Sequence, residues 1–230
     1  MPQRFLIDPV EYEQRRSCFD LCRWINQKLE DMRATGNFDE LYFERSDPTS
    51  NVKKLIEEAI PLSRLGLFLS TPGSEVYLTC YADNGNRDAL VEITGFNNRA
   101  FKVEITTTED ENSTHRRQAL ARYGHVPLTG TVSKSGREIT SSGEMICADA
   151  EDERCISLML ERLQRKADSR RYDRETAILV FFTEFRTIDP QYRARLALRT
   201  QRYLLEKQPE VRDVYYCYTT DYSIDHVRAA

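Results

Sequence analysis

Apolar and polar residues alternate in two neighbouring segments between Asp88 and Thr108. The segments are joined by Asn97-Asn98-Arg99, a polar tripeptide that is typical of a tight turn. A period of two residues sends successive side chains to opposite faces of a strand. The pattern therefore predicts two paired strands that share an apolar face, made of Ala89, Val91, Ile93, Phe101, Val103 and Ile105.

The rest of the chain shows the periods of helices and of further strands. One long helix is expected from the Asp8-Pro9 cap to Gly36, and a second from Ser50 or Asn51, which Pro61 should end or bend. Later helices are predicted at about 115–123, 150–171 and 190–205, strands at 75–81, 177–182 and 211–218, and a small hairpin within 129–140. The strand at 177–182 is the most continuously apolar, so we expect it at the centre of the sheet.

This order of elements predicts an α/β fold. A three-strand meander followed by strand–helix–strand crossovers gives a mixed sheet that is flanked by helices on both faces. With 230 residues, 40% of them apolar, the chain is long enough to build such a core. We expect an N-terminal helical extension over residues 1–48 that packs on an α/β domain over residues 49–230.

Charge and cysteine content exclude several classes of protein. The chain has 33 Lys and Arg against 37 Asp and Glu, and its net charge of -4 offers no global attraction for nucleic acid. Its six cysteines form no CxxC pair and follow no secretory leader, so we expect reduced thiols in a cytoplasmic protein. No segment approaches the ~18 apolar residues of a membrane span, so no membrane partner is expected.

Two carboxylates stand out on the alternating strands. Asp88 opens the first strand and Glu104 lies within the second. Carboxylates on neighbouring rigid strands are the oxygen ligands that a hard cation such as Mg2+ requires. The same pattern also describes an ordinary hairpin with one face in solvent, which is the commoner structure for alternating strands.

The order of elements from about Ser50 to Tyr218 resembles the PD-(D/E)xK phosphodiesterase superfamily, which has a restriction-endonuclease-like fold. In that superfamily an Asp opens the second strand of the meander, and the third strand carries Glu-x-Lys. Asp88 matches the first position. Glu104-Ile105-Thr106 matches the second, with Thr in place of Lys.

The resemblance implies a metal-dependent deoxyribonuclease with Mg2+ or Mn2+ as its cofactor. A Glu from the first core helix often completes the site, and Glu58 is favoured slightly over Glu57 because it lies nearer the apolar stripe. The implied metal ligands are therefore Glu58, Asp88, Glu104 and the carbonyl of Ile105.

The missing Lys is the departure from the superfamily pattern. Thr106 can hydrogen-bond a water but supplies no positive charge, which is worth roughly a hundredfold or more in rate. Lys102 shares a strand face with Glu104 and is one candidate replacement. The implied catalytic residues are Asp88, Lys102, Glu104 and Thr106.

The resemblance makes DNA the expected partner, and local basic segments are the places to contact it. The candidate DNA-binding residues are Arg116, Arg117, Gln118, Lys166, Arg170 and Arg171. Arginine-rich faces suit phosphates, but a helix surface rich in Arg is also a common solvated surface. The segment from Lys166 to the strand at Ile178 also looks like the corresponding segment in nuclease-like proteins of phages and mobile elements.

Two other hypotheses stay open. Thr106 in place of Lys is also what a degenerate member of the same fold would show, serving as a DNA-binding or protein-interaction module without catalysis. A third hypothesis is a scaffold subunit in a mobile-element or phage assembly, with the long first helix as the surface for its protein partner; a homo-oligomer is also an open alternative.

Overall fold

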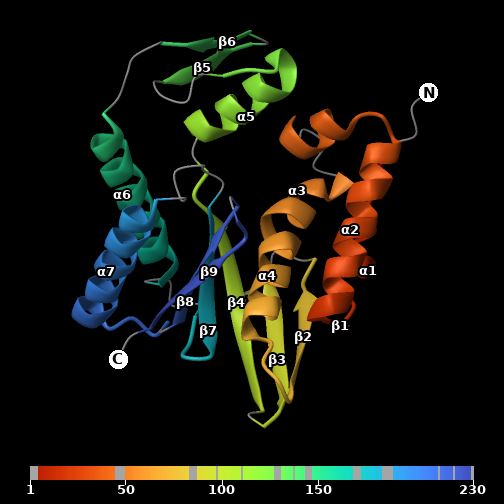
Figure 1. Ribbon diagram of the computed structural model, residues 1–230, viewed down its shortest axis with the longest axis vertical. Coiled ribbons are helices and arrows are strands. Elements are labelled where there is room, and N and C mark those ends of the chain that lie inside the picture. The colour runs from red at the N-terminus through yellow and green to blue at the C-terminus, as the bar shows by residue number, and fades with distance from the viewer. Residues whose placement is uncertain are drawn as a thin grey trace.

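A mixed β-sheet forms the centre of the computed structural model of this chain (Figure 1). The structure describes residues 5–44, 50–82, 87–96, 98–109, 111–126, 131–136, 138–142, 147–167, 172–182, 189–211, 213–219 and 221–228. Within these residues, the sheet has seven strands in the order β1-β2-β3-β4-β7-β8-β9. They are β1 (Arg16–Ser17), β2 (Ser74–Cys80), β3 (Ala89–Gly95), β4 (Arg99–Thr107), β7 (Thr176–Phe182), β8 (Asp213–Tyr218) and β9 (Ile224–Arg228).

Strand β4 joins two halves of the sheet that pair differently. It pairs antiparallel with β3, where Ala89 lies opposite Val103, and parallel with β7, where Glu104 lies opposite Ile178. Strands β2, β3 and β4 form the predicted meander, and β7 and β8 follow as parallel neighbours. Parallel neighbours need crossover connections, so the predicted mixed sheet with crossovers is confirmed.

Helices cover both faces of the sheet, as predicted. In Figure 1, α2 and α4 lie on one face and α6 and α7 on the other, while α5 and the hairpin β5–β6 lie beyond one end. The helices are α1 (Pro9–Tyr12), α2 (Cys18–Ala34), α3 (Val52–Lys54), α4 (Ile60–Leu69), α5 (Glu111–Tyr123), α6 (Ala148–Ala167) and α7 (Pro190–Lys207). The hairpin strands are β5 (Val132–Ser135) and β6 (Glu138–Ser141), with Gly136 at φ +60° in the predicted turn.

Strand β7 contributes to both hydrophobic cores. Every residue of β7 is buried. Ala177, Leu179 and Phe181 join the core under α2 and α4. The alternate residues, Ile178, Val180 and Phe182, join the core under α6 and α7. The prediction that 177–182 is covered on both faces is confirmed, but the centre of the seven described strands is β4, and β7 is its neighbour.

The predicted single helix from residue 8 to residue 36 is wrong. Asp8 caps only the short α1, and the chain then enters β1, whose Arg16 pairs with β2. A new helix begins after Ser17, whose side-chain oxygen accepts a hydrogen bond from the backbone N–H of Asp20 at 3.1 Å. The spacing of apolar residues is helical throughout residues 8–36, but pairing of β1 with the sheet edge interrupts the helix.

The predicted N-terminal extension, residues 1–48, contributes to the main core. Its buried apolar residues pack in the same cluster as β2, β3 and β4, and they are Ile7, Tyr12, Cys18, Leu21, Ile25 and Met32. The boundary near residue 48 stays a prediction.

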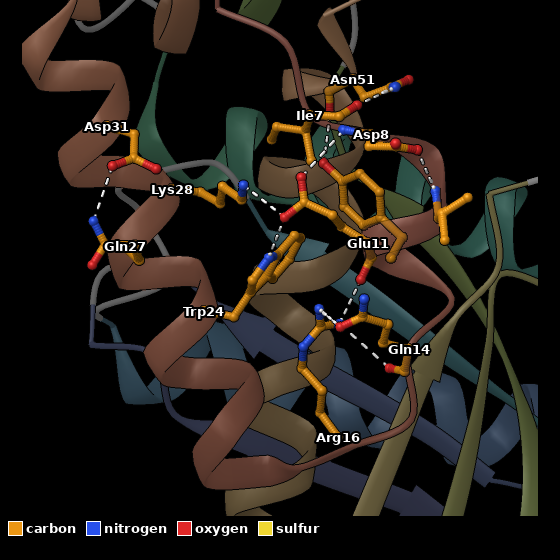
Figure 2. Close-up of polar contacts among 12 residues, drawn as sticks. Ile7, Asp8, Glu11, Gln14, Arg16, Trp24, Gln27, Lys28, Asp31 and Asn51 are labelled. Atoms are coloured by element: carbon orange, nitrogen blue, oxygen red, sulfur yellow. Dashed lines mark hydrogen bonds and ion pairs between the residues drawn. The ribbon is translucent and has the colours of Figure 1, made fainter.

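Figure 2 shows a polar network that joins α1 to α2 around Glu11. The Glu11 carboxylate accepts a hydrogen bond from Trp24 Nε1 at 3.1 Å and lies 2.6 Å from Lys28 Nζ. Close by, the hydroxyl of Tyr12 donates to the carbonyl of Asn51 at 2.8 Å. These contacts fix the N-terminal segment against α2 and the start of α3.

Pro61 does not end the second helix, which continues as α4. The residues before it, Leu55–Ala59, form a π-helical turn in which Ile60 N donates to the carbonyl of Leu55. Proline has no N–H, and in a regular α-helix its ring clashes with the carbonyl four residues earlier. The wider turn relieves this clash, and such turns are frequent at functional sites. Here the turn carries Glu58.

The sequence pattern missed β9. This strand pairs antiparallel with β8 and has only two apolar residues, Ile224 and Val227, so it lacks a clear alternation. All six cysteines are free thiols in the structure. Among the residues that the structure describes, no helix is both long enough and apolar enough to span a membrane.

We expect Glu11→Ala to lower the free energy of unfolding by about 1–2 kcal/mol, because it leaves Trp24 and Lys28 without their shared acceptor. Urea denaturation measures the change. Glu30→Ala is the matched control, since it removes an exposed ion pair with Arg33 and should cost at most ~0.5 kcal/mol. Equal losses in the two variants would contradict a stabilising role for the network.

Candidate active site

Asp88 lies at the entry to β3, beside the middle of β4. The register that pairs Ala89 with Val103 brings Asp88 next to the step from Glu104 to Ile105. There Oδ2 of Asp88 accepts a hydrogen bond from the backbone N–H of Ile105 at 2.7 Å. The bond fixes one carboxylate oxygen of the half-buried Asp88 against the backbone of β4.

Glu104 faces the side of the sheet that α6 covers. Its strand neighbours Val103 and Ile105 point into the core under α2 and α4, so alternation turns Glu104 the other way. The residue is only 6% exposed. Its carboxylate forms an ion pair with Nζ of Lys166, in the last turn of α6. Burial of this acid is thus matched by a cation from a distant part of the chain.

Glu58 approaches Asp88 from the helical layer on the other face. It forms an ion pair with Lys54, one turn earlier. Burial is the main cause that raises the pKa of Glu58 to about 7, and the negative charge of Asp88 adds to it while Lys54 opposes it. Glu57, the alternative in the sequence, lies 3.9 Å from the exposed Lys53. Glu58 is therefore the acid of this turn whose charge is coupled to Asp88.

Asp88 lies between two other acids, and each of these is paired with a lysine. Burial raises its pKa, and the nearby Glu104 raises it further, whereas the N–H of Ile105 and the ammonium groups of Lys166 and Lys54 oppose the shift. We call Lys54, Glu58, Asp88, Glu104 and Lys166 the acid–lysine cluster. It combines three acids from separate elements with a lysine at each end.

The cluster is not a closed three-carboxylate metal site. Among the described residues, no three His, Cys, Asp or Glu side chains group closely enough to hold a metal ion. Glu58 belongs to the layer of α4, and Glu104 faces the layer of α6, so the sheet separates them. Asp88 and Glu104 are the pair whose chemistry fits a hard divalent cation, because both are carboxylates and the charge of Glu104 raises the pKa of Asp88.

The other predicted site residues of β4 have different surroundings. Lys102 lies 2.6 Å from Asp173, in the turn before β7, and that contact lowers the pKa of Asp173. Thr106 is half-buried and lies opposite Val180 of β7. Ile105 offers its N–H to Asp88, and the ligand role of its carbonyl stays a prediction.

The structure describes four of the six predicted DNA-binding residues, and contacts within the protein are known for several of them. Arg117 forms an ion pair with Glu109 at 2.6 Å, and both side chains are largely buried. Gln118 accepts a hydrogen bond from Lys134 of β5 at 3.1 Å. Lys166 contacts Glu104, Arg116 shares α5 with Arg117, and both Arg170 and Arg171 lie outside the described residues. DNA binding stays a prediction.

Sequence reasoning missed Lys54 as a site residue and named Lys166 only as a DNA-binding candidate, not as a partner of Glu104. Lys54 had a local signal, because a Lys four residues before a Glu on a helix favours an ion pair. Lys166 had no local signal for its contact with Glu104, since the two residues are far apart in the sequence.

No family model, no curated protein and no solved structure matches the chain.

We expect the stability of the protein to fall as the pH rises from about 4.5 to about 7 through the titration of Glu58. Its pKa is higher in the folded state, so in this range the folded state binds more protons than the unfolded chain. In Glu58→Gln, the difference in unfolding free energy between pH 5 and pH 8 should shrink by roughly 3 kcal/mol.

Chemical denaturation in a chelator-containing buffer at both pH values measures this difference. Glu57→Gln is the matched control, and it should keep most of the pH dependence, because burial at position 58 is unchanged. An unaltered difference in Glu58→Gln would refute the link between burial and titration.

Proposed function

We propose that this protein is a metal-dependent nuclease that cleaves DNA phosphodiester bonds at Asp88 and Glu104. The observation that carries the proposal is the pair itself: Asp88 lies beside the buried Glu104, whose negative charge adds to burial in raising the pKa of Asp88. An isolated stabilising role does not explain two like charges at one buried place. Perturbed acids of this kind cluster at functional sites.

The order of strands and helices supports the restriction-endonuclease-like fold as part of this proposal. A core helix, α4, precedes the meander β2-β3-β4, and the chain later adds β7 in parallel to β4. Asp88 at the entry to β3 and Glu104 in β4 occupy the two strand positions that the resemblance implies. Fold and acid placement therefore support the same superfamily.

Hydrolysis of a phosphodiester needs an activated water and relief of charge on the phosphate oxygens. A bound Mg2+ or Mn2+ would supply both, since it lowers the pKa of water and attracts the developing negative charge. Asp88 and Glu104 would hold the ion. The N–H of Ile105 fixes the orientation of the Asp88 carboxylate, which suits a ligand on a rigid strand. Glu58 acts on Asp88 through its charge.

One observation favours a second candidate, a DNA-binding or protein-interaction module of the same fold without catalysis. Two of the three acids are already paired with lysines, and the strand position of the motif Lys holds Thr106. Such a cluster could be a structural ion network. The two candidates differ in whether the acids bind a divalent cation.

We expect purified protein to cleave plasmid or single-stranded DNA with Mg2+ or Mn2+, and Asp88→Asn and Glu104→Gln each to reduce the rate at least ~100-fold. Gel-based cleavage and Mn2+ calorimetry measure activity and metal binding together. Glu92→Gln is the control, because Glu92 is on β3 but pairs with Arg15.

Full activity in Asp88→Asn or Glu104→Gln would reject the assigned site. Absence of both cleavage and Mn2+ binding in the unaltered protein would favour the non-catalytic module.

A further inference from the structure

Lys166 reaches Glu104 from α6, on the strand face where Thr106 lacks a charge. We propose that Lys166 supplies the positive charge of the site in place of residue 106. This proposal rests on the proposed nuclease function and adds a residue to it. Its basis is the ion pair between Nζ of Lys166 and Oε1 of Glu104.

Alternation along β4 brings positions 104 and 106 to the same face. A lysine at 106 would project beside Glu104, two residues along the strand. Lys166 reaches the same carboxylate from the helix that covers this face, so its ammonium group occupies the neighbourhood that a lysine at 106 would occupy. Lys102, the other lysine of this face, is paired with Asp173 instead.

The backbone of α6 is held firmly where Lys166 projects. The neighbouring Leu163 and Ala167 are buried in the core with β7 and β8. Near its start, at the other end from Lys166, α6 is joined to α7 by ion pairs from Arg195 to Asp152 at 2.8 Å and from Arg199 to Glu153. A side chain on a well-packed helix has a defined position. A positive charge that stabilises a reacting phosphate must be placed in this way.

The exposure of the pair suits this role. The side chain of Glu104 is 8% exposed, whereas that of Lys166 is 33% exposed. About a third of the lysine side chain is thus accessible to solvent, the side from which an incoming phosphate would arrive. An ammonium beside a carboxylate can attract phosphate oxygens as a compact charge.

Moving the positive charge from position 166 on α6 to position 106 on β4 tests the proposal. We expect Lys166→Ala to lower kcat for DNA cleavage about 100-fold with little change in KM, and the added Thr106→Lys substitution to restore at least about tenfold. Lys166→Arg should keep more activity than Lys166→Gln, which guards against a misfolded double variant. Arg165→Ala is the control, since Arg165 is exposed and paired with Glu161 on the same helix.

A structural role alone would not be rescued from position 106. Full cleavage by Lys166→Ala would overturn the proposal, and so would equal activity of the Arg and Gln variants.

Mn2+ calorimetry gives a readout that does not depend on cleavage. Without the ammonium that competes for Glu104, Lys166→Ala should bind Mn2+ severalfold more tightly, and Thr106→Lys should reverse the gain. If the unaltered protein does not cleave DNA, the proposed function fails. The Mn2+ affinities of the variants then test the placement of the Lys166 charge by themselves. Unchanged Mn2+ affinity in Lys166→Ala would then overturn the placement of the charge.

Discussion

The double pairing of β4 is the constraint on which the rest of the structure depends. Hydrogen bonds to β3 on one side and to β7 on the other fix its rotation, so its side chains must alternate between two helical layers. Val103 and Ile105 fill one core. Glu104 is thereby turned toward α6, and a slip of one residue would bury it among apolar side chains instead.

A buried acid in this position destabilises the fold unless a cation compensates its charge. Lys54 compensates Glu58, and Lys166 compensates Glu104. Asp88 lies between them and accepts a hydrogen bond from the N–H of Ile105. Partial compensation leaves the pKa values of Asp88 and Glu58 raised. Stability alone would favour apolar residues here, which supports the proposal that the cluster is a functional site.

Many of the basic residues in the described part of the chain form ion pairs within the protein. Arginines of α7 hold α6 through Asp152 and Glu153, and Arg193 pairs with Asp221 in the turn before β9 at 2.9 Å. These contacts serve the site indirectly, because they fix the helix that carries Lys166. Abundant arginine in a helix thus indicates cross-element ion pairs here at least as much as a surface for phosphate.

The sequence by itself determined the features that depend on near neighbours. Alternation predicted the meander, the apolar run predicted the inner strand, and the strand positions of Asp88 and Glu104 predicted two acids at one junction. Three features had only weak signals in the local sequence. They are the edge strand β1 that divides the predicted first helix, the π-helical turn before Pro61, and β9. Only the tertiary structure decided that Lys166 meets Glu104, because that contact joins residues far apart in sequence through the packing of α6 on the sheet.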